Sequence, residues 1–376
     1  MRMPIEAAPE RRYTLCGDVA AEARVAQDLS RLATGIDSEV GDTLRALLLV
    51  GAFARAEGGI VKIDGEPCAA APGYLLLAVF ARGARRHERS LATMAATWSR
   101  LLHAEVAIRP IAARQLPHVP ASRLWFHVGR GQAITLTGSP SVIAAVQTWR
   151  ADALRWEEAD FTLAPALTEL ALSALEAPSD LSRAVQCTHE TALALGDALL
   201  LRRGQYAETL AARSRALETA QASAILRAAY ADAITWARRP DLWRPESTTP
   251  SAWLQSTQRR LLEVHLEAEA ARLGSGRDLL AYVSRPRPLH ASPDEGPPGR
   301  MARTAQALAA ERPELASWLT HPFERLLRAA IALGFGWRAP ACRVFAAKLL
   351  HAAPDDTALA AALRAHSRAA LPDALR

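Results

Sequence analysis

The spacing of hydrophobic positions along the chain changes near residue 141, from short apolar segments to helical periodicity. Short apolar segments bounded by glycine, proline or polar residues are typical of buried strands. The predicted strands cover residues 44–50, 59–63, 74–80, 104–108, 124–128 and 133–137. Helical spacing within the same part predicts helices over residues 13–40 and 87–102.

Two short polar stretches are predicted to be turns between neighbouring strands. Asp64-Gly65 is a turn-prone pair and would close a hairpin that begins at residue 59. Gly129-Arg130-Gly131 would join the predicted strands 124–128 and 133–137. It lacks the third glycine and the following helix of a dinucleotide-binding loop, so a turn is the better interpretation.

After residue 141 the strand pattern ends, and apolar residues recur at the i, i+3, i+4 and i+7 positions of helices. The predicted helices cover residues 163–175, 181–203, 206–220, 222–237 and 254–273, with more within 302–370. Proline-rich stretches at 238–250 and 285–300 interrupt the pattern. The expected parts are 1–150, an α/β core with a helical lead-in; 151–282, a helical domain; 283–300, a proline-rich loop; and 301–376, a C-terminal helical segment.

Composition limits the class of protein without naming a function. Half of the residues are hydrophobic and 22% are charged, which indicates a folded chain and excludes a disordered one. The net charge of +6 permits weak attraction to nucleic acid or anionic lipid but indicates neither. Abundant arginine and alanine are typical of a high-GC bacterial coding sequence, which further weakens that signal.

The chain shows no signal for export or for a membrane span. Its four cysteines are scattered without a C-x-x-C pair, which argues against a zinc ribbon or a disulfide framework. The first residues lack the apolar segment of a signal peptide. No apolar run reaches the about 18–20 residues that cross a bilayer. We therefore expect a cytoplasmic protein.

A glycine turn follows the first predicted strand and carries the most specific motif of the chain. Residues 48–59 read LLVGAFARAEGG and resemble the G-[GS]-x-x-R-G-E-G signature of bacterial nucleotidyltransferases of the polymerase-β type. Gly51, Arg55 and Glu57 match it, while Ala52 and Ala56 replace a Gly or Ser and a Gly. The resemblance implies an α+β protein, with a small mixed-sheet nucleotidyltransferase-like core followed by a large all-helical region.

The resemblance also implies three metal-binding aspartates, and this chain has none of them. In the family, an Asp-x-Asp pair lies on a strand about twenty residues after the turn, and a third Asp lies on a later strand. Those positions hold Gly73, Leu75 and Ala107 here, which have no oxygen ligand to offer Mg²⁺. The resemblance covers about residues 40–215, and in its helical part Thr188 to Glu190 stand where related members carry a Lys.

The remaining polar and aromatic groups are interpreted mainly as structure. The segment around His265, with Glu263, Glu267 and Glu269, reads as a solvated helix face, since no second histidine lies one turn away. Arg82, Arg85, Arg86 and Arg89, like Arg202 and Arg203, read as solvated or salt-bridged arginines. Among nine tryptophans, Trp243, Trp253 and Trp318 lie near breaker-rich loops in the region 240–320, and we interpret them as a candidate interface.

The chain is thus interpreted as a catalytically inactive nucleotidyltransferase-like protein, a structural or regulatory subunit that contacts another protein chain. No cofactor is expected, and nucleic acid is not an expected partner. Three alternatives remain open: an ordinary strand–turn–helix in another α/β protein, a divergent enzyme, and a nucleotide sensor that binds through Gly51 and Arg55. The enzyme would transfer a nucleotide from Mg-NTP to a small acceptor, and could use Asp64, Glu66 or Glu57 as ligands.

Overall fold

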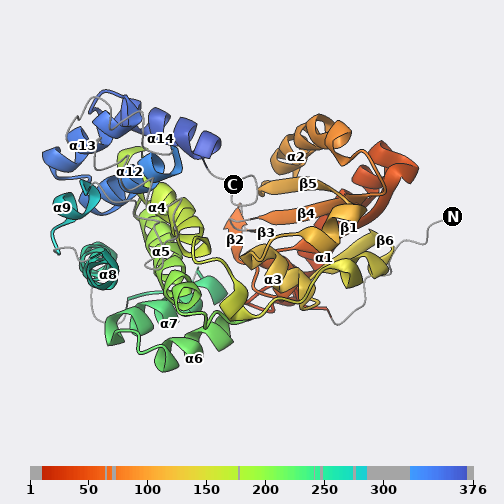
Figure 1. Ribbon diagram of the computed structural model, residues 1–376, viewed down its shortest axis with the longest axis horizontal. Coiled ribbons are helices and arrows are strands. Elements are labelled where there is room, and N and C mark those ends of the chain that lie inside the picture. The colour runs from red at the N-terminus through yellow and green to blue at the C-terminus, as the bar shows by residue number, and fades with distance from the viewer. Residues whose placement is uncertain are drawn as a thin grey trace. The chain divides into compact units, whose positions relative to one another are not determined.

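The computed structural model is an α+β protein with a small mixed sheet of four strands, a two-stranded hairpin and many helices, and the expected fold class is confirmed at this level (Figure 1). The structure describes residues 11–63, 66–69, 73–176, 178–240, 242–245, 249–273, 277–285 and 322–370. The chain divides into two compact units. The first is Met1–Leu154 with Ala207–Ala212 and Ile234–Trp243, and the second is Arg155–Tyr206, Arg213–Ala233 and Arg244–Arg376.

The four-stranded sheet of the first unit has the order β5-β4-β1-β6. Its strands are β1 (Leu44–Val50), β4 (Tyr74–Phe80), β5 (Val106–Ala112) and β6 (Ile134–Gly138). The central strand β1 runs antiparallel to both β4 and β6, while β4 and β5 are parallel. Both faces of β1 and β4 are covered, which explains why these two strands are almost continuously apolar.

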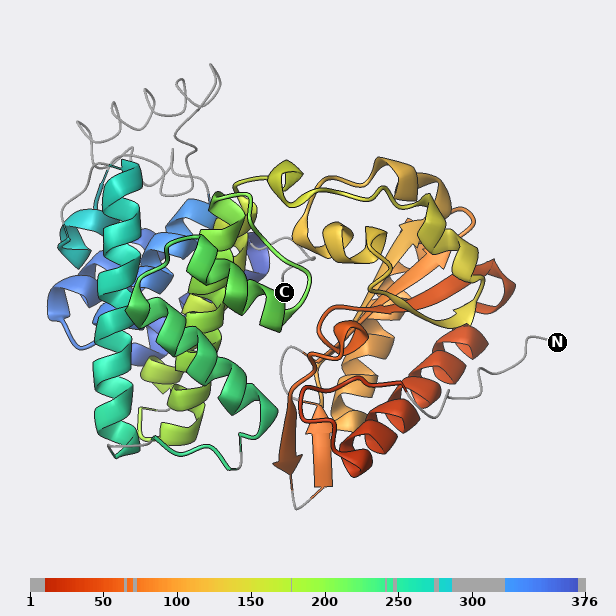
Figure 2. The ribbon, with the colours of Figure 1, turned by 90° about the horizontal axis from the view of Figure 1, so that it is seen from below.

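Helices α1 (Val19–Val40) and α2 (Glu88–Leu102) cover one face of the sheet (Figure 2). Asp18 caps α1, since its carboxylate accepts the backbone N–H of Ala21 at 3.0 Å. Below the helix, the Tyr74 hydroxyl donates to the Asp28 carboxylate of α1 at 3.0 Å in a buried hydrogen bond. Burial raises the pKa of Tyr74, so its hydroxyl keeps the proton that it donates.

The opposite face of the sheet is covered by short helical turns and by α3 (Arg123–Gly129). The predicted strand at 124–128 is therefore wrong. A short apolar run does not distinguish a buried strand from a buried helix by its spacing. Trp125 and Val128 are both buried against this face, which a short helix achieves as well as a strand would. Gly129 ends the helix at a close approach, because a Cβ there would lie 2.3 Å from the backbone oxygen of Gln147.

The predicted hairpin is present as β2 (Ile60–Ile63) and β3 (Glu66–Ala69), which pair antiparallel. Its turn residues, Asp64 and Gly65, lie outside the described residues. The residues before α1 return to this region, where Thr14 forms a parallel bridge with Gly58.

The described part of the second unit is built from helices, and the helical prediction is confirmed for these residues. The helices after residue 155 are α4 (Glu158–Glu176), α5 (Leu181–Arg202), α6 (Leu210–Thr219), α7 (Ala224–Arg238), α8 (Pro250–Leu273), α9 (Leu279–Val283), α12 (Pro322–Gly336), α13 (Pro340–Leu350) and α14 (Asp356–Ala370). Helix α4 packs against α5, α12 and α14. Most of the expected proline-rich loop, and residues 301–321 of the expected C-terminal segment, lie outside the described residues.

All four cysteines are free thiols. Within the described ranges, no helix is both long enough and apolar enough to traverse a lipid bilayer.

Candidate functional site

The glycine turn is well formed and stands at the C-terminal end of β1. Gly51 has a φ of 80°, in the region that favours glycine. The backbone oxygen of Ala52 accepts the N–H groups of Arg55, at 3.0 Å, and Glu57, at 2.9 Å. The backbone then passes over the buried ring of Phe53, and a Cβ at Gly58 would lie 2.3 Å from it. Local packing therefore explains Gly58 without any ligand.

The structure brings Gly51, Leu75 and Ala107 together, as the resemblance predicts. Leu75 pairs with Val50 across β1 and β4, and with Ala107 across β4 and β5. A Cβ added to Gly51 would lie 3.6 Å from the Cβ of Leu75. The prediction that these three segments share one sheet is confirmed.

The side chains at this edge are apolar, and one position has no space for a side chain. Leu75 is half-buried and packs against the cluster on the α3 side of the sheet. The backbone N–H of Tyr74 donates to the backbone oxygen of Glu105 at 2.7 Å. This hydrogen bond draws β4 and β5 together beside Gly73. A Cβ at Gly73 would lie 1.9 Å from that oxygen. An aspartate at position 73 would therefore require the backbone to move.

Arg55 and Glu57, the charged residues of the motif, bind each other and a distant segment of the chain. Arg55 Nε lies 2.9 Å from Glu57 Oε2, and both side chains are largely buried. The other oxygen of Glu57 accepts the backbone N–H of Leu210 at 2.5 Å. Leu210 is the first residue of α6, so Glu57 caps this helix from the turn.

The segment that Glu57 holds belongs to the first unit, although its neighbours along the chain belong to the second. Thr209 caps the same helix end through the N–H of Ala212, at 3.1 Å. The preceding residue, Glu208, forms an ion pair with Arg130. Sequence reasoning missed these contacts, because Glu57 and Leu210 lie 153 positions apart and no local pattern links them.

The three carboxylates available to a divergent enzyme have different positions. Glu57 is engaged by Arg55 and Leu210, as described. Glu66 lies in β3, and Asp64 lies outside the described residues. Across the ranges that the structure covers, no group of three or more His, Cys, Asp or Glu side chains is placed to hold a metal ion.

The positions that replace the family's Lys lie on α5 in the second unit, and none of them is cationic. Thr188 is fully buried, and its hydroxyl accepts from Gln258 at 3.1 Å. Burial lowers the pKa of His189 to about 3, which keeps its ring neutral, and raises the pKa of Glu190 to about 7.

The tryptophans of the candidate interface are placed separately. Trp243 is half-buried in the first unit. Trp253 is on α8 in the second unit, with its ring 4.7 Å from that of His189. Trp318 lies outside the described residues. An interface at these positions stays a prediction.

A buried ionic cluster joins α4, α5, α8 and α9. The predicted solvated helix face is wrong for His265 and Glu269, whereas Glu263 and Glu267 are exposed as predicted. His265 and Glu269 are 2% and 0% exposed. Arg202 bridges Glu269 and the Asp160 carboxylate, the latter at 2.5 Å. Arg272 forms a second ion pair with Glu269, which also accepts the Tyr282 hydroxyl at 3.1 Å. The sequence showed acidic residues on a helix, but only the packing of four helices decides that Glu269 points inwards.

The charges of this cluster are set by competition between burial and pairing. Burial alone would raise the pKa of Glu269, but Arg202 and Arg272 lower it to about 2. Burial lowers the pKa of His265 to about 4, so the ring is neutral at pH 7. Its Nε2 atom has no hydrogen-bond partner within the described residues. The cluster therefore has the features of a structural ion-pair network.

The chain was compared with protein-family models, with curated proteins and with solved structures, and nothing in the three comparisons matches it. The nucleotidyltransferase resemblance therefore rests on the chain's own residues.

Proposed function

We propose that this protein is a catalytically inactive relative of the polymerase-β-type nucleotidyltransferases, which works as a structural or regulatory subunit of a protein assembly. The observation that carries the proposal is the edge of the sheet beside Gly51. Leu75 and Ala107 lie side by side there, where the family would place metal ligands, and Gly73 has no space for a side chain.

Nucleotidyl transfer needs Mg²⁺ to neutralise the triphosphate and to stabilise charge on the attacking and leaving oxygens. Mg²⁺ requires oxygen ligands in near-octahedral geometry. Neither a leucine nor an alanine supplies an oxygen. The half-buried Leu75 instead fills the place of a charged ligand with hydrocarbon, which stabilises the fold and disfavours a bound cation.

The charged residues of the motif support the same interpretation. A sensor that binds a nucleotide through Gly51 and Arg55 would need the guanidinium to reach a phosphate. Arg55 is held by Glu57, and Glu57 is held by the backbone of Leu210. The turn thus contributes to the internal structure of the chain. A folded unit without a catalytic site can still serve a partner through its surface, since function belongs to sites and not to the fold.

Calorimetric titration of the full-length protein with ATP, with and without Mg²⁺ or Mn²⁺, tests the loss of the site. We expect no binding in either case and no transfer of labelled nucleotide to small acceptors. Binding that needs the metal, together with transfer, would establish the divergent enzyme. Binding without metal that is lost in Arg55→Ala would establish the sensor.

The assembly role needs a separate measurement. The tagged protein purified from its native cell at moderate salt should elute with another chain in a fixed ratio, measured by native mass spectrometry. A specific, stable contact of this kind buries on the order of 1,200–2,000 Å². Recovery of the monomer alone would contradict the role as a subunit.

A further inference from the structure

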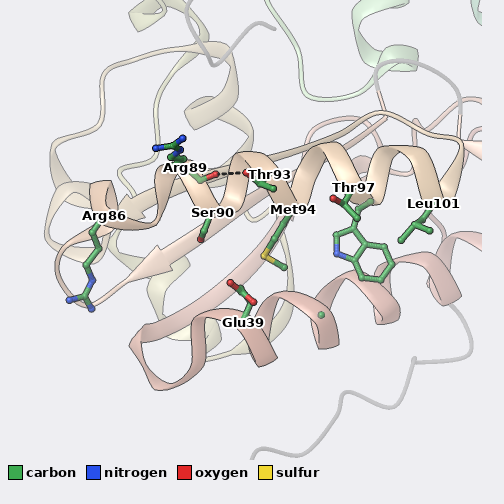
Figure 3. Close-up of a pocket in the computed structure, with 10 residues that line it drawn as sticks. Glu39, Arg86, Arg89, Ser90, Thr93, Met94, Thr97 and Leu101 are labelled. Carbon is green, nitrogen blue, oxygen red and sulfur yellow. Dashed lines mark hydrogen bonds between the residues drawn. The ribbon is translucent and has the colours of Figure 1, made fainter.

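An open groove runs between α1 and α2 on the outer side of the first unit (Figure 3). Its volume is about 780 Å³. Both helices already pack on the sheet through their inner faces, so the groove is additional to the core. None of the residues of the glycine turn lines it.

The floor of the groove is a second apolar stripe on α2. Leu91, Ala95 and Leu102 of this helix are buried in the core. Met94 packs partly against the same core and also lines the groove, together with Leu101, which is 62% exposed. A large aliphatic side chain on a helix surface gains little while it faces water, so this stripe is suited to cover by another apolar surface.

Trp98 completes the floor, and the chain makes space for it in α1. A Cβ at Gly35, within α1, would lie 2.7 Å from the Trp98 ring. Glycine inside a helix costs about 1 kcal/mol relative to alanine. In return, the half-buried indole lies directly against the helix backbone and remains part of the groove.

Positive charge is concentrated at one end of the groove. Arg86 and Arg89 lie at this end, with the Arg89 guanidinium drawn on the side of α2 away from α1 (Figure 3), and Arg82 and Arg85 precede them; all four are exposed. Within the part of the chain that the structure describes, none of the four forms an ion pair. Glu39 lies on the opposite wall and points towards α2 (Figure 3).

This distribution favours a peptide over a nucleic acid. A nucleic-acid backbone needs positive charge along the length of its path. Here the charge is at one end, the floor is apolar, and the opposite wall carries a carboxylate. An amphipathic helix with apolar residues at i, i+4 and i+7 and acidic residues at one end complements the basic end and the apolar floor. The stretch from Arg86 to Leu101 spans about 20 Å, which corresponds to a helix of about 15 residues.

Resting on the proposed role as a subunit, we propose that the α1/α2 groove binds an amphipathic helical segment of a partner protein, with its acidic end on Arg86 and Arg89 and its apolar face on Met94, Trp98 and Leu101. The occupant is defined by this chemistry: a helix with acidic residues at one end and an apolar stripe along the rest.

Panning of a phage-displayed library of random 16-residue peptides on the full-length protein tests the proposal. We expect enrichment of peptides with acidic residues at one end and an apolar stripe of helical spacing. Fluorescence anisotropy of a labelled enriched peptide then measures its affinity. Arg86→Glu/Arg89→Glu should weaken binding at least tenfold, and so should Leu101→Ser.

The matched control is Arg31→Glu/Arg100→Glu, which makes the same change of net charge at exposed arginines outside the lining of the groove and should leave binding unchanged. A peptide with lysines in place of its acidic residues should recover binding to Arg86→Glu/Arg89→Glu. All substituted positions are exposed, and near-ultraviolet circular dichroism checks that each variant is folded.

Three results would overturn the proposal: no enriched peptides, binding that the groove variants leave unchanged, or single-stranded DNA that competes at stoichiometric concentration. These results are independent of the titration with Mg-ATP. Detection of nucleotide transfer would contradict the proposed function but would not affect the peptide measurement. Groove variants that leave peptide binding unchanged would contradict the groove proposal but not the absence of metal ligands at Leu75 and Ala107.

Discussion

Replacing Glu57 by alanine removes a side chain that serves two partners in the first unit. It leaves Arg55, which is 14% exposed, beside an empty space, and it removes the acceptor of the Leu210 N–H at the start of α6. A hydrogen bond to a charged group contributes about 1.5–3 kcal/mol. Breaking a buried ion pair costs about 3–5 kcal/mol, and the residual exposure of Arg55 places this site at the lower end. The hydrogen bond and the ion pair share the Glu57 carboxylate, so their contributions overlap and do not simply add. We therefore expect Glu57→Ala to destabilise the protein by about 3 kcal/mol.

Two companion variants separate the contributions. Glu57→Gln keeps an oxygen for Leu210 but loses the charge, and should cost about 1–2 kcal/mol. Arg55→Met/Glu57→Leu replaces the pair with apolar side chains of similar size, and should cost less than Glu57→Ala because no buried charge is left behind. Asp152→Ala is the control, since it breaks the exposed pair with Arg150 and should have no measurable effect.

Urea unfolding followed by circular dichroism gives the stability, and amide hydrogen exchange gives the location. Exchange at the first residues of α6 should speed up in Glu57→Ala and stay at the wild-type rate in the control. A Glu57→Ala protein with the unfolding midpoint and the α6 exchange of the wild type would refute the assignment of Glu57 as a structural cap.

Other predictions test the vestigial site, the helical packing and the ionic cluster. Leu75→Asp/Ala107→Asp places two carboxylates side by side across β4 and β5, and should create a Mn²⁺ site that electron paramagnetic resonance detects. The amide pair Leu75→Asn/Ala107→Asn is the matched control. Failure of the folded Asp variant to bind Mn²⁺ would contradict the site geometry. Gly196→Ala should destabilise the protein by about 2 kcal/mol in urea unfolding, because its Cβ would lie 2.3 Å from the buried ring of Tyr230; a gain of about 1 kcal/mol, as at an open helical glycine, would be the opposite result. The pKa of His265 is about 4 when folded and about 6.5 when unfolded, so the unfolded state binds more protons between these values and stability should fall as the pH falls from about 6.5 to about 4. His265→Phe should remove about 3 kcal/mol of that fall, measured as the difference between the two unfolding curves over this pH range, and parallel curves would contradict the buried neutral ring.

Local pattern was enough to predict most of the elements. The apolar runs at β1 and β4 and the helical spacing after residue 155 each depend on neighbours within a few positions, so they can be read directly from the sequence. It was not enough for α3. There, the apolar run at 124–128 is shorter than those of β1 and β4 and forms part of a helix. A run this short does not distinguish the two states by its spacing, so the tertiary packing decides.

The sequence also determined the chemistry of the candidate site, since the absence of oxygen ligands at Gly73, Leu75 and Ala107 needs no coordinates. Only the tertiary structure decided what that edge of the sheet does instead. It shows that Glu105 leaves no space for a side chain at Gly73 and that Glu57 caps a helix 153 positions away. It also shows that Glu269, on a helix with many polar residues, is buried between two arginines. These facts depend on contacts between segments far apart in the chain, and the strength of a hydrogen bond or an ion pair depends on the burial that those segments create together.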